Sequence, residues 1–302
     1  MPGFMSSSTA FTICKVETPK EFTLDALRAH AFTPDIDADG KLFGWVGLGD
    51  LLDTDGFELA ASDGRFSGFS FRLDTRKASG AVIRLHLAEA VREEVASGKK
   101  VGSKRKKELK ETITAKLTSR AEFVPSVTDC LWDVERNRLL VASSSTKGVE
   151  PVLELFKSSF GMEAKPLIPA ADIPRLFSEI LRGEGYPCLG YTLHAMGSAS
   201  LAASEQAEEK SAVAVQNSLN AVAQALDEGM AIQKLNLVAT SDNDADWQVE
   251  FSLDTMLVVS GLRLPKPEKG AEIEASFLLS ADTCASVADM VEEMSLAETG
   301  KG

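Results

Sequence analysis

The chain has 302 residues, of which 44% are hydrophobic and 25% are charged, a composition typical of a folded globular protein and not of a disordered one. Its formal net charge is −13 and its pI is near 4.8, so the average charge argues against a polyanionic partner. No apolar stretch approaches the roughly 20 residues that a membrane-spanning helix needs, and Met1–Ala10 lacks the pattern of a secretion signal. We therefore expect a protein of the cytoplasm that has no membrane partner.

Strand and helix patterns alternate in the first third of the chain. Apolar alternation between glycines and aspartates predicts strands at 11–16, 43–46, 57–60 and 66–73. A helix is predicted at 24–31, because Thr23 is a good N-cap and Pro34 cannot continue a helix.

The middle of the chain is predicted to contain a pair of helices. Apolar residues at helical spacing indicate one helix over 81–95 and a second over 103–117, joined by a basic elbow between Gly98 and Gly102. Further patterns predict strands at 127–134 and 139–143, a helix at 149–160 and a strand at 165–168.

The second half predicts more strands than helices. Apolar spacing predicts a helix at 173–181, and the segment at 198–228 is helix-competent but weakly amphipathic. Strand patterns occur at 189–196, 232–239, 247–253, 256–262 and 276–279. Val287, Met290, Val291 and Met294 mark one face of a closing helix.

These elements predict the α+β class, with antiparallel sheets and packed helices. We divide the chain into an N-terminal strand and helix region (1–75), a basic helical region (76–125), an α/β region (126–170) and a C-terminal α+β region (171–302).

Charge is segregated along the chain. Residues 72–120 contain 14 lysines and arginines but six acids, a net charge of +8, whereas the rest of the chain carries −21. Within this stretch, the run K-K-V-G-S-K-R-K-K-E-L-K at 99–110 places seven cations in twelve positions. The seven positive charges repel one another, and binding to phosphates relieves this repulsion. When the phosphates are neutralised, the counterions condensed on the nucleic acid are released. The run therefore indicates contact with nucleic-acid phosphates, although a solvated helix surface has the same composition.

Two acidic motifs have spacings found in metal sites. Asp35–Gly40 (D-I-D-A-D-G) matches the start of a calcium-binding EF-hand loop, but Val46 occupies the position of the bidentate carboxylate, which favours an ordinary turn. Asp242, Asp244 and Asp246 could converge as in a metal-dependent nuclease, yet the same spacing is typical of a hairpin turn.

Other candidate catalytic or metal-binding residues are scattered. The histidines are His30, His86 and His194, and the cysteines are Cys14, Cys130, Cys188 and Cys284. Neither set has the clustering of a zinc site or a disulfide framework, so we expect no metal, no cofactor and no enzymatic activity.

A series of short stretches has the order and spacing of one known family. They are A-F-T-P at 31–34 and G-W-V at 44–46; K-E-L-K-E-T-I-T-A-K-L-T-S-R-A at 107–121, L-W-D at 131–133 and L-L-V at 139–141; V-L-E-L-F-K-S-S-F-G at 152–161 and P-L-I-P at 166–169; L-D-E-G-M-A-I-Q-K-L-N-L at 226–237; and S-F-L-L-S-A-D at 276–282. Each stretch is weak alone, but together they are collinear over nearly the whole chain. In this the chain resembles the RdgC family of bacterial recombination-associated proteins.

The resemblance implies an elongated, multi-part monomer that closes with a second copy into a ring. The homodimer would enclose double-stranded DNA in a basic hole without sequence specificity, in the nucleoid, and would restrain the loading of RecA on DNA. It implies DNA contacts at Lys77, Lys99, Lys100, Lys104, Arg105, Lys106, Lys107, Lys110 and Lys234, and a dimer contact at Phe123. Where the family has a Lys-Lys-Gln stretch this chain has Ala212–Gln216, so the run at 99–110 should carry more of the binding.

The sequence is also compatible with two other functions. Some sequences of the family carry an exonuclease label, and Asp242, Asp244 and Asp246 would be the acids of such an activity. The charge of −21 outside the basic segment would instead suit a module that binds a basic protein.

Overall fold

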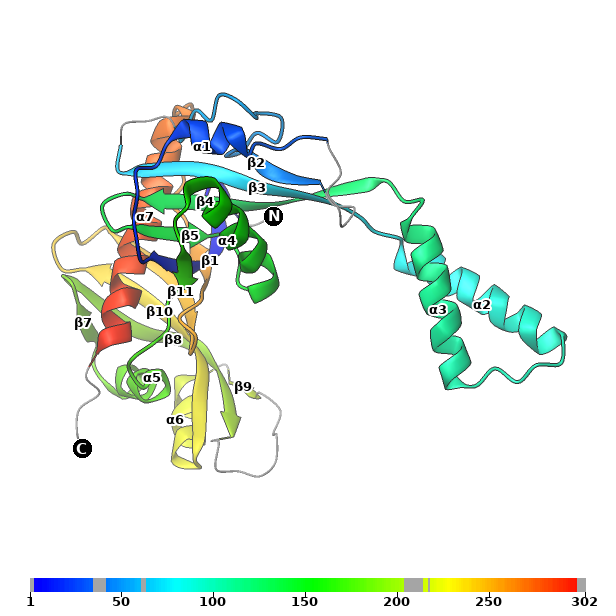
Figure 1. Ribbon diagram of the computed structural model, residues 1–302. Helices are drawn as coiled ribbons and strands as arrows, with labels where there is room; N and C mark the ends of the chain where they lie inside the picture. Colours follow the sequence, from blue (N-terminus) through cyan, green and yellow to red (C-terminus); the bar gives the residue numbers. More distant parts are fainter. Residues whose placement is uncertain (1–2, 35–41, 61–63, 204–213, 217, 298–302) are drawn as a thin grey trace. The chain divides into compact units, whose positions relative to one another are not determined.

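Antiparallel strands and packed helices make up the computed structural model, which describes residues 3–34, 42–60, 64–203, 214–216 and 218–297 (Figure 1). The predicted α+β class is confirmed. The chain divides into a core unit, Met1–Ala31, Trp45–Phe71 and Thr128–Gly302, and a hairpin unit, Phe32–Gly44 and Arg72–Val127. No helix in the described ranges is long and apolar enough to cross a membrane. The motif Asp35–Gly40 lies outside the described residues, as do Ala212 and Val213.

One antiparallel sheet organises the strands. Its hydrogen-bonded order is β2-β3-β4-β5-β1-β12-β11-β10-β8-β7, with β6 beside β1 and β9 beside β8. The bounds are β1 Ser8–Val16, β2 Leu42–Gly47, β3 Phe66–Arg76, β4 Phe123–Asp133, β5 Arg138–Val141, β6 Ala164–Pro166, β7 Tyr186–Cys188, β8 Tyr191–Ala203, β9 Ala214–Gln216, β10 Met230–Ser241, β11 Gln248–Asp254 and β12 Val259–Arg263. β1 occupies the middle because its start pairs with β12, from Ser8 opposite Arg263, and its end pairs with β5, from Thr12 opposite Val141.

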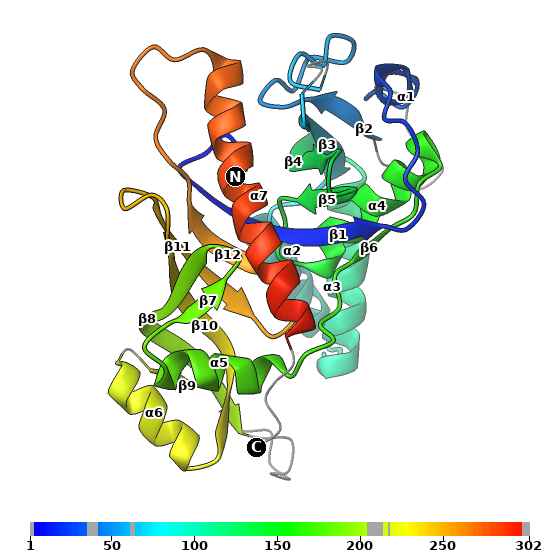
Figure 2. The same ribbon diagram turned by 90° about the vertical axis from the view of Figure 1, so that its left-hand side faces the viewer.

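A long C-terminal helix, α7 (Ile273–Leu296), lies against the sheet of the core unit (Figure 2). Its buried side chains include Phe277, Ala281, Cys284, Ala288 and Val291, which recur every three or four residues. That period is helical, so the strand predicted at 276–279 is wrong: these residues belong to α7, where Phe277 is buried and Leu278 and Leu279 are exposed. The closing helix predicted further along is confirmed.

Shorter helices cover other parts of the core unit. α5 (Ile173–Arg182) and α6 (Leu219–Asp227) pack on β8 and β10, whereas α4 (Thr146–Phe160) contacts α1 (Leu24–Ala29) and β6. Aromatic rings fill the space beside α4: Trp132 lies 5.8 Å from Phe156, and Trp45 meets Phe69 edge-on at 5.1 Å between ring centroids. Trp45 also donates its indole N–H to the Ser159 hydroxyl, at 2.8 Å.

Buried charges join β4 and β5 to α7. The fully buried guanidinium of Arg138 pairs with Asp133 at 2.9 Å, Asp289 at 2.7 Å and Glu292 at 3.2 Å, and donates to the Ala285 carbonyl at 3.0 Å. Each carboxylate has a second cation: Arg65 binds Asp133 through two hydrogen bonds, Arg136 pairs with Asp289, and Lys15 pairs with Glu292. Burial alone would raise the pKa of Asp133, but the hydrogen bond from Arg65 and the charges of Arg138 and Arg65 hold that pKa below its ordinary value.

Two other sequence predictions are corrected. Residues 57–60 form a turn and not a strand, because the Asp53 carboxylate accepts hydrogen bonds from the backbone N–H groups of Asp55, Gly56 and Phe57. Phe57 adopts a left-handed φ of 48° and its ring is buried. The segment at 198–228 is only partly helical: β8 continues to Ala203 because it pairs with β10, and α6 begins at Leu219.

Candidate nucleic-acid interface

The basic segment folds as a helical hairpin. Its helices are α2 (Gly80–Ala96) and α3 (Ser103–Thr118), and Gly98, with a φ of 80°, makes the left-handed turn of the elbow between them. The predicted pair of helices is confirmed. The two helices contact each other, and Leu87 and Leu109 are half-buried, but neither helix has a fully buried side chain, and both are described from end to end.

Arginine contacts fix the base of the hairpin within the hairpin unit. The guanidinium of Arg76 donates to the carbonyl of Ser119, and it lies 4.7 Å from the centroid of the Phe123 ring. Arg72 binds the Asp74 carboxylate through two hydrogen bonds, of 2.9 and 2.7 Å. Phe123, which the family resemblance places at a dimer contact, is therefore held by a cation–π interaction at the start of β4.

Arg105 closes the hairpin near the elbow. Its guanidinium pairs with Glu94 of α2 at 2.7 Å and with Glu108 of α3 at 3.1 Å. The hydrogen bond that Arg105 donates lowers the pKa of Glu94, and the hydrogen bonds that Glu94 and Glu108 accept raise the pKa of Arg105. The charge of Arg105 is thus matched inside the hairpin, and this residue is better placed to join α2 to α3 than to bind a phosphate.

The other predicted cations of the run are exposed. Lys99 and Lys100 lie in the elbow, and Lys104, Lys106, Lys107 and Lys110 lie on α3. Lys107 has a loose pair with Glu111, at 3.9 Å; the other five form no ion pair with any carboxylate that the structure describes.

The first turn of α3 concentrates positive charge. Gly102 occupies the N-cap and the turn contains no acid. A helix N-terminus carries partial positive charge of its own, so the unpaired charges of Lys104 and Lys106 there are electrostatically unfavourable until an anion approaches.

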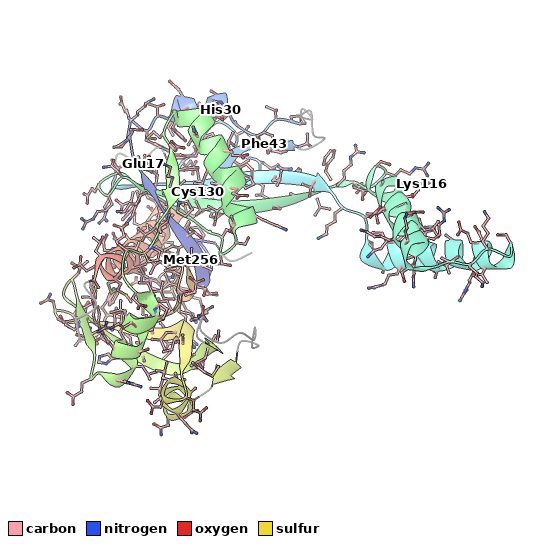
Figure 3. All side chains as sticks on the ribbon, turned by 60° about the horizontal axis from the view of Figure 1, so that its bottom comes forward. Glu17, His30, Phe43, Lys116, Cys130 and Met256 are labelled. Carbon is pink, nitrogen blue, oxygen red and sulfur yellow. The ribbon has the colours of Figure 1, made fainter. Side chains whose placement is uncertain are left out.

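The two sides of the hairpin differ in charge. One side has two adjoining hollows of about 380 and 410 Å³ whose charged lining is entirely basic: Arg84, Arg92, Lys106, Lys107 and Lys110. We call this the cationic side. The other side has a hollow of about 400 Å³ in which Glu89 and Glu93 lie with Lys116, Arg120 and His86. We call this the mixed side; Lys116 is labelled on α3 in Figure 3.

The structure groups some of the predicted DNA contacts and separates others. Lys77 follows β3 and is exposed in the hairpin unit with the run at 99–110, whereas Lys234 lies on β10 of the core unit, opposite Asp254. Arg84 and Arg92 are not among the DNA contacts predicted from the sequence. Their spacing of eight residues, with Ala88 between, puts all three on one side of α2 and could have revealed them.

Asp242, Asp244 and Asp246 follow β10 in a turn. The Asp242 carboxylate accepts from the Thr192 hydroxyl at 2.9 Å, and that of Asp244 accepts from the backbone N–H of Asp246 at 3.1 Å. Within the part of the chain that the structure describes, no three histidine, cysteine, aspartate or glutamate side chains are grouped as a metal site requires. His30 and His86 make local contacts, with the Ala26 carbonyl and the Glu89 carboxylate. All four cysteines are buried and free.

Fold and site together define an α+β protein in which one helical hairpin carries an excess of positive charge, although the total charge is strongly negative. Residues 8–274 match the family described as "Putative exonuclease, RdgC". The chain therefore belongs to the RdgC family, which is associated with recombination. No curated protein matches the chain.

Proposed function

We propose that this protein binds double-stranded DNA through its phosphate backbone, without sequence specificity, and that the helical hairpin makes the main contact. The observation that carries the proposal is a set of lysines on α3, Lys104, Lys106 and Lys110, which are exposed and form no ion pair with any carboxylate that the structure describes, in a chain whose net charge is −13. A surface of this kind gains free energy by neutralising phosphates and releasing their counterions.

The composition of the hairpin supports phosphate contact over base contact. Residues 77–122 contain no phenylalanine, tyrosine or tryptophan, and His86, the single aromatic ring among them, lies beside Glu89 on the mixed side, so the cationic side offers no ring on which an unpaired base could stack. Lysines bind phosphates as point charges and carry no sequence information.

Family membership supports a wider proposal. The protein acts as a homodimer that encloses the duplex, with Phe123 near a contact between the copies, and it limits the access of RecA to DNA in the nucleoid. Native mass spectrometry of the protein with a short duplex tests the stoichiometry: two chains on one duplex are expected, and one chain per duplex at all concentrations would refute the dimer.

Salt dependence tests phosphate binding. Neutralising four phosphates per chain gives a slope of about −3.6 in a plot of log affinity against log salt, which is an affinity loss of about 150-fold between 50 and 200 mM salt. An affinity that barely changes over this range would refute a phosphate-dominated contact.

A pair of triple variants tests the role of the hairpin. Replacing Lys106, Lys107 and Lys110 by glutamine should make the slope less steep by about 2.7, on every DNA sequence alike. The control replaces Lys147, Lys266 and Lys269, three exposed lysines of the core unit, and removes the same charge. Equal effects of the two variants would refute the hairpin as the contact.

We further propose that DNA binding is not accompanied by cleavage. The carboxylates of Asp242 and Asp244 are engaged by groups of their own turn and of β8 and therefore serve the hairpin between β10 and β11. End-labelled duplex incubated with the protein and magnesium or manganese should keep its length; shortening that disappears in the Asp242→Asn/Asp244→Asn variant would instead assign an exonuclease.

A further inference from the structure

Two arginines of α2 face the same hollows as the lysines of α3. Arg84 lines both hollows of the cationic side together with Lys106, and Arg92 lines one of them. Both arginines are exposed, and neither forms an ion pair among the described residues.

The surface between these arginines is small and apolar. Ala88 separates them on α2, and Leu87 and Val91 lie beside it in the floor of the hollow. A phosphate backbone can approach such a surface closely, since the lining of this hollow contains no carboxylate. Eight residues of helix place the two Cα atoms about 12 Å apart along the axis, enough for each guanidinium to reach a different phosphate of one strand.

The mixed side lacks this arrangement although it also carries two cations. Lys116 and Arg120 share their hollow with Glu89 and Glu93, so the charges there largely cancel. An approaching phosphate would meet two carboxylates, and like charges brought together raise the free energy of the complex.

We infer that DNA lies along the cationic side of the hairpin, and that Arg84 and Arg92 of α2 bind its phosphates together with Lys106, Lys107 and Lys110 of α3. The inference rests on the proposed function and specifies which side of the hairpin carries it. A guanidinium presents a fork of N–H donors that matches a phosphate, so each arginine can bind through two hydrogen bonds.

The test compares two double variants of the full-length protein that remove equal charge. Arg84→Gln/Arg92→Gln neutralises the cationic side of α2, and Lys116→Gln/Arg120→Gln neutralises the mixed side. Binding of a fluorescent duplex is followed by anisotropy from 50 to 300 mM salt. The first variant should reduce the salt slope by about 1.8 and weaken binding about 60-fold at 0.1 M salt, and the second should change affinity less than about threefold.

A conservative variant separates loss of contact from loss of structure. Arg84→Lys/Arg92→Lys keeps both charges and should restore the salt slope to within about 0.5 of the original value. Circular dichroism of each variant shows whether α2 and α3 remain helical; if the glutamine variant loses helix, the lysine variant and the mixed-side variant still decide the matter through their slopes.

The outcomes distinguish the inference from the proposed function. Equal losses in the two double variants overturn the choice of side but leave DNA binding by the hairpin intact. No loss in Arg84→Gln/Arg92→Gln, with a large loss when Lys106, Lys107 and Lys110 are neutralised, overturns the role of the arginines alone. No loss in any hairpin variant overturns the proposed function as well.

Discussion

Replacing Arg138 by methionine should destabilise the core unit strongly while leaving the hairpin unit untouched. Methionine fills much of the volume of the arginine side chain but cannot pair with a carboxylate. In the native protein the guanidinium contacts Asp133, Asp289, Glu292 and the carbonyl of Ala285, and its side chain is fully buried.

The expected loss in the free energy of unfolding depends on the ion pairs that each carboxylate keeps when Arg138 is replaced. Removing one partner of a buried ion pair typically costs about 3–5 kcal/mol, because the remaining charge is left without compensation. Here Asp133 keeps Arg65, Asp289 keeps Arg136 and Glu292 keeps Lys15, so the cost should lie near the lower limit, about 3 kcal/mol. For a cooperative unit of this size that is a fall in Tm of roughly 6–12 °C.

Thermal and urea unfolding, followed by circular dichroism, measure the effect. Arg136→Met is the matched control, because Arg136 is 54% exposed and has one loose ion pair, with Asp289 at 3.4 Å. Its loss should cost under about 1 kcal/mol. If Arg138→Met costs no more than Arg136→Met, the buried charges do not hold β5 to α7, and the reasoning is refuted.

Three further predictions follow from the geometry. Arg105→Ala should change the salt slope of DNA binding by less than about 0.5, against about 0.9 for Lys106→Ala, since Arg105 is committed to Glu94 and Glu108; equal changes would make Arg105 a phosphate contact. Burial raises the pKa of Cys14 and of Cys188 to about 12, so a thiol-reactive disulfide reagent at pH 8 should label neither until the protein is unfolded, and rapid labelling of the native protein would contradict their burial. Asp133 has a folded-state pKa below its ordinary 3.8, so its contribution to stability is fully present above that pH and is lost as pH falls through the folded value; the stability difference between the native protein and Asp133→Asn should shrink below about pH 4, and a difference constant down to pH 2 would refute the linkage.

The sequence predicts most elements of this fold because their apolar periods are clear. The pair α2 and α3, the strand β1 and the closing part of α7 follow from local pattern alone. The predictions fail where contacts between residues far apart in the sequence determine the secondary structure. Residues 276–279 are a short apolar run that suits strand or helix equally, and only the buried positions further along α7 resolve it. The end of β8 is a strand because β10 supplies its hydrogen bonds.

The candidate site is predictable only where a local pattern of charge marks it. The lysines of α3 are conspicuous as a charge run, and their exposure follows from their density. The spacing of Arg84 and Arg92 places them on one side of α2, but only the structure shows that this side adjoins Lys106 of α3. The pairing of Arg105 with Glu94 depends on how the elbow turns back at Gly98, which no helical spacing within one element can reveal.

The absence of a fully buried side chain from α2 and α3, which the structure describes in full, has a consequence for how the protein opens. Segments with little buried apolar surface open locally at a small fraction of the global free energy of unfolding, so backbone amides in the hairpin should exchange their hydrogens long before those of β1 or α7. In calorimetry, the heat of unfolding would come almost entirely from the core unit, and the hairpin would contribute little. A bound duplex would slow exchange selectively in α2 and α3, and part of the intrinsic affinity would be spent on ordering these helices. Substitutions that raise helix propensity at exposed hairpin positions could therefore tighten DNA binding without adding any contact.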